Sequence, residues 1–147
     1  MTPGVGVWRA PMRPRGEDVL AADAALAAGV VGIGDDDPRR VRRLAELPEG
    51  DFVWTRDADG LYFVGRVGAG RWVSPVGGLT HARAARWLER PFGEDDVPVA
   101  VAATFARGGR NLQRIRDPSV EAATAACWEE AAQAAGSAPG GPRISMS

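Results

Sequence analysis

The sequence predicts an α+β fold: a small β-barrel of about five to six strands with helices packed on its outside. Three observations lead to this prediction. Short runs of β-prone residues, separated by turns that contain glycine, fill the middle of the chain. Helical patterns lie on both sides of these runs. The length of 147 residues suits one domain with its own core, which we place at residues 1–135.

The N-terminal third alternates predicted strands and helices. Residues 5–8 are a short apolar run that predicts a strand. Residues 17–28 predict a helix, because acidic residues occupy the first turn, apolar residues share one face and a glycine follows. Residues 30–34 predict a buried strand that ends in glycine. The acidic triplet at 35–37, followed by a proline, then predicts the start of a short arginine-rich helix.

The middle of the chain consists of short strands joined by tight turns. The predicted strands are residues 52–55, 61–64, 71–74 and 81–88. The predicted turns are residues 56–60 and 68–70. Gly60 favours the first turn because glycine adopts a positive φ at little cost.

The C-terminal third returns to helical patterns. Residues 99–105 fit either a short helix or a buried strand. Residues 117–135 predict a final helix that opens on Asp-Pro-Ser, with Glu121 as a capping partner. Residues 136–147 are rich in Gly, Pro and Ser, which predicts a disordered tail.

Charge and cysteine content narrow the class of protein. The formal net charge is −1, and all 18 basic residues are arginine, which fits either a GC-rich genome or the recognition of phosphates and carboxylates. This nearly neutral charge argues against a protein that coats nucleic acid non-specifically, although it is compatible with one local basic face. Neither a secretory signal nor a membrane span is expected, so we expect no membrane partner. A single cysteine, Cys127, favours a cytoplasmic location.

Residues for catalysis or metal binding are scarce. One histidine, His81, and one cysteine rule out a His/Cys zinc cluster and disfavour a Cys–His nucleophile. The glycines at 32 and 34 lack the spacing of a phosphate-binding loop. An enzyme that uses carboxylates such as Asp51, Glu94 or Asp96 is the least favoured class, since no paired spacing supports it. We therefore expect a non-enzymatic protein with no cofactor and no metal.

The tryptophans and arginines are the residues that indicate a binding function. Four of the five tryptophans, Trp8, Trp54, Trp72 and Trp87, fall on predicted strands, where each either fills the core or joins an aromatic cage. Arginines flank the same strands and turns. The candidates for nucleic-acid backbone contacts are Arg56, Arg83, Arg86, Arg107, Arg110 and Arg114. Aromatic residues interleaved with arginine are typical of proteins that stack bases and hold phosphates.

Three segments resemble the PUA-like superfamily. They are VVGIG at 30–34, GDFVWTRDADGLYFVGRV at 50–67 and HARAARWLERPF at 81–92. They are most similar to the EVE and YTH branch and to the reader domains of modification-dependent restriction enzymes. The likeness spans roughly residues 5–116 and implies a PUA-like barrel.

The resemblance also implies a ligand and a site. It implies an aromatic-walled pocket for a flipped or single-stranded modified base, with Gly34, Asp35, Trp54, Arg56 and Trp72 at its rim. We add Trp8 from the first strand as a sixth candidate. Relatives often carry a tryptophan at the position of Asp35. Here the carboxylate either accepts a hydrogen bond from a base such as cytosine or marks a lost pocket.

Two functions remain open from the sequence. The first is a module that recognises a modified, for example methylated, base in DNA or RNA. The resemblance implies a separate nuclease or effector as its partner, since the nuclease that is fused to many relatives is missing. The second is a protein-interaction or regulatory module that acts through the C-terminal helix and Trp128 without binding nucleic acid.

Overall fold

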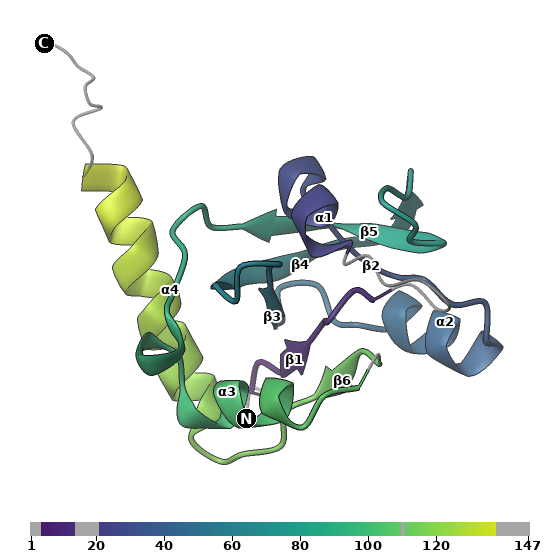
Figure 1. The fold of residues 1–147 in the computed structure, drawn as a ribbon. Coiled ribbons are helices and arrows are strands. Elements are labelled where there is room, and N and C mark those ends of the chain that lie inside the picture. The colour runs from purple at the N-terminus through teal and green to yellow at the C-terminus, as the bar shows by residue number, and fades with distance from the viewer. Residues whose placement is uncertain (1–3, 14–20, 110, 138–147) are drawn as a thin grey trace, which may run out of the picture.

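The computed structural model describes residues 4–13, 21–109 and 111–137 (Figure 1). Its elements in chain order are β1 (Val7–Arg9), α1 (Ala22–Ala28), β2 (Val30–Ile33), α2 (Pro38–Ala45), β3 (Phe52–Arg56), β4 (Tyr62–Val73), β5 (His81–Trp87), the 3-10 turn η1 (Glu94–Asp96), α3 (Val99–Ala106), β6 (Gln113–Arg114) and α4 (Val120–Ser137). The later part of the helix expected over 17–28 is observed as α1, and its first residues fall in the segment 14–20, which lies outside the described part. α4 continues past the predicted start of the tail at residue 136, and residues 138–147 also lie outside the described part.

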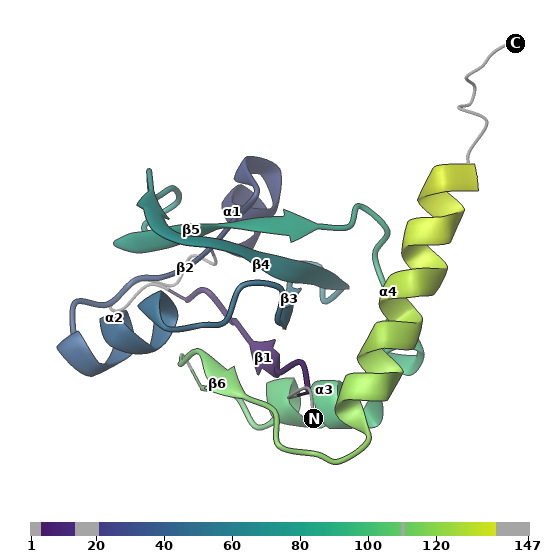
Figure 2. The same ribbon diagram turned by 180° about the vertical axis from the view of Figure 1, so that it is seen from behind.

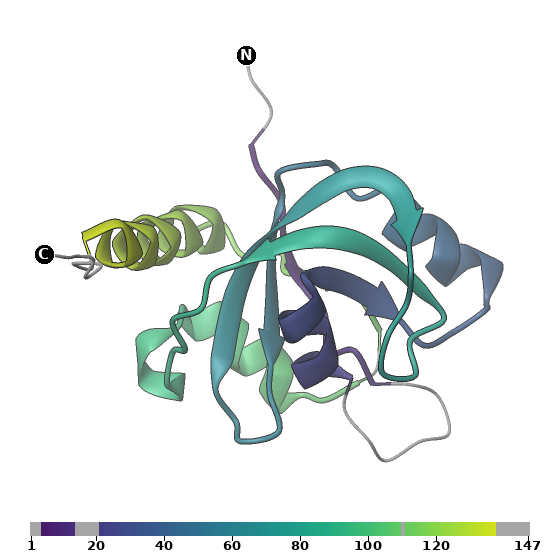
Figure 3. The same cartoon turned by 90° about the horizontal axis from the view of Figure 1, so that it is seen from above.

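The six strands form one open mixed sheet, so the prediction of a closed β-barrel is wrong. The strand order is β2-β5-β4-β3-β1-β6. Neighbouring strands are antiparallel except for β1, which runs parallel to β3. β2 and β6 are the two edges, and no strand pairing joins them among the described residues. Figure 3 shows that β4 and β5 curve strongly, so the sheet curls without closing.

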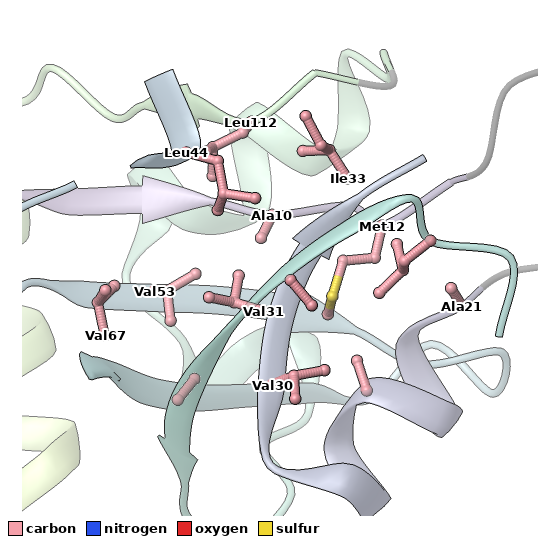
Figure 4. Close-up of a cluster of buried hydrophobic side chains, with 14 of the residues drawn as sticks. Ala10, Met12, Ala21, Val30, Val31, Ile33, Leu44, Val53, Val67 and Leu112 are labelled. Atoms are coloured by element: carbon pink, nitrogen blue, oxygen red, sulfur yellow. The ribbon is translucent and has the colours of Figure 1, made fainter. Parts of the chain in front are cut away.

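Side chains fill the space between the two edge strands, and no backbone hydrogen bonds of a strand pairing bridge it among the described residues. Leu112, which precedes β6, belongs to the same buried cluster as Ile33 of β2 and Leu44 of α2 (Figure 4). A barrel closes only when its edge strands pair along their length. β6 has two residues and α2 packs beside β2, so this pairing does not form. The result is a seam between β2 and β6, bordered by α2.

Residues 68–70 belong to the strand β4, so the prediction of a turn at these residues is wrong. Its pairing with β5 changes register between Val67 and Trp72, as at a β-bulge. Gly68 marks a close approach: a Cβ at this position would lie 2.9 Å from the carbonyl oxygen of Ala84 on β5. The glycines therefore let two strands pack closely instead of ending one of them. The turn at residues 56–60 is confirmed, with Gly60 at a φ of 85°.

β3 is buried on both of its faces. Phe52 and Trp54 point into a cluster formed with α3 and α4, while Val53 between them points into a second cluster with α1 and α2. Figures 1 and 2 show α2 at one end of the molecule and α3 and α4 at the other. A strand covered on both faces has no side chain left to face solvent.

The remaining predictions concern the C-terminal half. The prediction of a strand at residues 81–88 is confirmed as β5, and residues 99–105 form the helix α3, one of the two alternatives. Within the described part of the chain, no helix combines the length and the hydropathy that crossing a membrane requires.

Candidate functional site

The three candidate tryptophans lie in three different places. Trp54 is fully buried, packs edge-on against Phe92 at 5.6 Å between ring centroids, and donates its Nε1 hydrogen to Thr124 Oγ1 at 3.2 Å. Trp72 is 47% exposed at the end of β4, with its ring 5.2 Å from the ring of His81. Trp8 is half-buried on β1. The structure does not bring these rings to one cavity, so no aromatic cage forms from them.

The arginine candidates also divide between the two faces of the sheet. Arg83 is 1% exposed, and it donates hydrogen bonds to the backbone carbonyls of Leu44, Leu47 and Gly68 at 2.7–2.9 Å. Its guanidinium is a brace inside the fold and is not accessible to a ligand. Arg86 is exposed, but its Cζ lies over the ring of Trp128 at 5.5 Å on the α4 side. Arg110 lies outside the described residues.

A cavity opens at the seam between β2 and β6, and we call it the α2 pocket. Its volume is about 250 Å³. Its walls come from the end of β2, from α2, and from the segments that follow β1 and precede β6. The lining residues are Arg13, Ile33, Gly34, Asp35, Arg40, Arg43, Asn111 and Leu112. Two of the sequence candidates, Gly34 and Asp35, therefore line a cavity, together with three arginines that were not among the candidates.

Hydrogen bonds and an ion pair hold Asp35 in place at the end of β2. Thr80, which precedes β5, accepts a hydrogen bond from the backbone N–H of Asp35 at 3.0 Å. The Asp35 carboxylate accepts the backbone N–H of Asp37 at 2.8 Å and forms an ion pair with Arg40. Asp35 thus fixes Arg40 at the pocket wall, and an arginine–carboxylate pair beside Asn111 offers both donors and acceptors to a ligand.

A second cavity, the β6 pocket, lies beside the first, with a volume of about 370 Å³. Its lining residues are Trp8, Arg43, Arg107, Gln113, Arg114, Ile115 and Arg116. Trp8 is oriented there by Asp51, whose Oδ2 accepts the indole Nε1–H at 2.9 Å and whose Oδ1 accepts the backbone N–H of Gly6 at 3.1 Å. The β6 pocket therefore combines an aromatic wall with arginines from two segments.

Arg43 joins the two pockets, since it lines both of them. Its Nη1 donates to the carbonyl oxygen of Leu112 at 3.3 Å, which ties α2 to the segment before β6. Among the described residues, the charged ones that line either pocket are arginines, apart from Asp35. A chain with a net charge of −1 has thus concentrated positive charge on one surface. We call the two pockets together the arginine surface.

Arg9 supports this surface from inside the fold. It is 4% exposed, and its Nη atoms donate to the carbonyl oxygens of Thr104 and Gly108 and to Gln113 Oε1 at 2.8–2.9 Å. These bonds shape the segment that carries Arg107. Burial, and then the positive charge of Arg107, lower the pKa of Arg9 from its ordinary value. Arg9 and Arg107 therefore place two positive charges close together beside the β6 pocket.

The orientation of α2 depends on its N-cap, Asp37. The Asp37 side chain accepts the backbone N–H of Arg39 at 2.9 Å, and Pro38 occupies the first turn. This hydrogen bond holds the pKa of Asp37 below its ordinary value. The acidic triplet was interpreted as a helix start, and Asp37 fills that role.

Replacing Asp37 by alanine is expected to lower the melting temperature near neutral pH, because α2 loses its cap. A lowered carboxyl pKa in the folded state stabilises the fold fully above the unfolded pKa, and this contribution is lost as pH falls through the folded value. The difference between the two proteins should therefore shrink as the pH falls below the ordinary carboxyl pKa and through the lowered pKa of Asp37. Asp37→Asn is the matched control, since asparagine caps equally well without titrating. Equal melting temperatures of Asp37→Ala and the parent near neutral pH would show that the cap is unimportant.

Four arginines that line the two pockets were not predicted from the sequence: Arg13, Arg40, Arg43 and Arg116. The arginine run on the predicted helix was visible in the sequence, but a run of charges is usually a solvated helix face. Only the curl of the sheet reveals that Arg40 and Arg43 face a cavity, whereas the side chain of Arg39 is 87% exposed.

Two further expectations concern the rest of the described chain. Trp128, which was considered as a marker of a partner surface on α4, is 9% exposed and packs against Phe52 of its own domain at 6.0 Å. Within the described ranges, no group of three His, Cys, Asp or Glu side chains is placed to hold a metal ion.

The chain was compared with protein-family models, with curated proteins and with solved structures, and no match was found in any of the three.

Proposed function

We propose that this protein binds single-stranded nucleic acid on the arginine surface, with phosphates held by Arg13, Arg43, Arg107 and Arg114. The observation that carries the proposal is the position of Arg43, which lines both of two adjacent arginine-rich cavities. Guanidinium groups hold phosphate oxygens through paired hydrogen bonds, and several of them in a row suit a polyanion.

A single strand fits these cavities better than a duplex does. The pockets are concave, with volumes of about 250 and 370 Å³, so a nucleotide must leave a helical stack to enter them. Trp8 in the β6 pocket supplies a ring on which an unstacked base can lie. Asp35 with Arg40, beside Asn111, supplies polar partners for a base edge in the α2 pocket.

The proposal retains part of what the sequence suggested. Nucleic acid as ligand, binding without catalysis, a cytoplasmic location and the roles of Trp8, Asp35, Arg107 and Arg114 are kept. Recognition of a modified base between Trp54 and Trp72 is left out, since Trp54 is buried in the core and Trp72 does not line either pocket.

A titration of a labelled single strand of about 8 nucleotides, followed by fluorescence anisotropy, tests the proposal. The logarithm of the affinity should fall with the logarithm of the salt concentration with a slope of about −2 to −3, as expected for roughly three to four phosphate contacts on a single strand. Trp8→Leu should weaken binding by roughly tenfold, the loss of one stacked base. Trp8→Phe should retain most of the affinity, because the ring is kept.

Trp72→Leu is the matched control and should leave the affinity unchanged, because Trp72 lies outside both pockets. A duplex of the same sequence should bind more weakly. Equal affinity for the duplex would contradict the single-strand proposal, and no binding of any strand at low salt would contradict the proposed function altogether.

A further inference from the structure

A third cavity lies next to the arginine surface, between the β3–β4 turn and the segment after α3. We call it the hairpin pocket, and its volume is about 210 Å³. Arg9, Arg13 and Arg56 supply its positive charge, and Arg13 also lines the α2 pocket. Arg13 therefore stands between the hairpin pocket and the arginine surface, as Arg43 stands between the two pockets of that surface.

The positive charge of the hairpin pocket is not neutralised within the described part of the chain. The Nη atoms of Arg9 donate to carbonyl and amide oxygens, which carry no net charge, and its buried Nε has no hydrogen-bond partner among the residues that the structure describes. Arg56 stacks over the ring of Tyr62 at 5.4 Å and makes one long hydrogen bond to Gly60 O at 3.5 Å. Among the described residues, neither arginine forms an ion pair with a carboxylate.

Asp57, the one carboxylate among the described residues of the wall, helps to shape the turn. Asp57 Oδ1 accepts the backbone N–H groups of Asp59 and Leu61, each at 2.9 Å. Among the described lining residues, three guanidinium groups are therefore in excess over one carboxylate. Such an excess attracts an anion, and the Nη groups of Arg56, which donate no hydrogen bond to another described residue, can hold it.

The other walls are apolar or bare backbone. Pro11 and Phe105 line one side, and Gly108 and Gly109 bring backbone close to Arg9 at φ values of 77° and 111°. A Cβ at Gly109 would lie 3.1 Å from Arg9 Nη2, so a larger residue would crowd the guanidinium as well as strain the backbone. An anionic group attached to an apolar or flat portion, as in a nucleotide, matches this combination of walls.

We infer that the hairpin pocket is a further phosphate subsite for the same strand, so that bound nucleic acid continues from the α2 pocket past Arg13 to Arg56. This inference rests on the proposed function and extends it, since it defines the direction in which a longer strand runs. Arg9 is a positioning residue, buried behind the wall, whereas Arg13 and Arg56 contact the phosphate.

A length series of single strands, from about 4 to about 12 nucleotides, tests the inference. The parent protein should bind long strands more tightly than short ones. Arg56→Gln should remove roughly a tenfold part of that gain and leave the affinity for the shortest strand unchanged. Arg90→Gln is the matched control: it removes the same charge from an exposed pair with Glu130, away from all three pockets, and should change neither affinity.

A failure of this inference and a failure of the proposed function give different results. If Arg56→Gln keeps the full length dependence, the strand does not reach the hairpin pocket and the inference is wrong, while the proposed function stands. If the parent protein binds no strand of any length, both fall. Inorganic phosphate is the second probe: stabilisation by phosphate that is lost in Arg56→Gln, with strand binding unaffected by the substitution, would assign the pocket to a free anion and overturn the inference.

Discussion

Replacing Arg43 by glutamine is expected to weaken the binding of a single strand by roughly 10- to 100-fold, the loss of charged hydrogen bonds worth about 1.5–3 kcal/mol. Arg43 lines both pockets of the arginine surface, and its one hydrogen bond among the described residues, to Leu112 O, is long at 3.3 Å. Most of its donors are therefore ready for a phosphate. The salt dependence should become shallower by about 0.7 for each phosphate contact that is lost.

Arg39→Gln is the control for this experiment, because it removes the same charge from the same helix. Its side chain is 87% exposed and lines neither pocket. Its affinity should stay within about twofold of the parent protein, as expected for a screened surface charge. Both residues are exposed, so neither substitution should change the stability by more than about 0.5 kcal/mol. Equal losses of affinity in the two variants would show that diffuse positive charge, rather than a site at Arg43, holds the strand.

The sequence predicted the elements better than it predicted how they assemble. Strand runs, turn glycines and capping residues are local signals, and β3, β5, α2 and α4 lie close to where these signals place them. Closure of the sheet is a property of its two edges. β6 comprises only Gln113 and Arg114, which no local pattern of strand residues reveals. The predicted barrel failed at this point, and the α2 pocket lies at the resulting seam.

Trp54 shows why the site was harder to predict than the fold. Its strand reads Phe-Val-Trp-Thr, an unbroken β-prone run rather than an alternation of apolar and polar residues, which is typical of a strand buried on both faces. The run therefore contained a signal for burial of Trp54, and the resemblance to a reader domain favoured the opposite interpretation. The roles of Arg40 and Arg43 had no such signal, because they depend on which side of α2 meets the seam.

Arg83 was predicted to contact nucleic acid but lies buried inside the fold. Its replacement by methionine is expected to lower the free energy of unfolding by about 3 kcal/mol. Five backbone carbonyl oxygens lie within hydrogen-bond distance of its guanidinium. They belong to Leu44, Ala45, Leu47, Gly68 and Ala69, at 2.7–3.3 Å. Three of them end α2 and its following turn, and two lie at the irregular part of β4. Methionine fills the volume and leaves these buried acceptors without donors. Equilibrium unfolding in urea measures the loss.

Two variants give this prediction its controls. Arg86→Met, on the same strand, should cost less than about 1 kcal/mol, because Arg86 is exposed and loses only its stacking on Trp128. Arg83→Lys should recover only part of the stability, since an ammonium group cannot reach carbonyls on both sides as a planar fork does. It also provides a measurable variant if the methionine variant does not fold. Unfolding of Arg83→Met at the same urea concentration as the parent protein would show that the brace does not hold α2.

If Arg83 does hold α2, strand binding by the folded Arg83→Lys protein should also weaken, because Arg40 and Arg43 reach the pocket from the helix that Arg83 anchors.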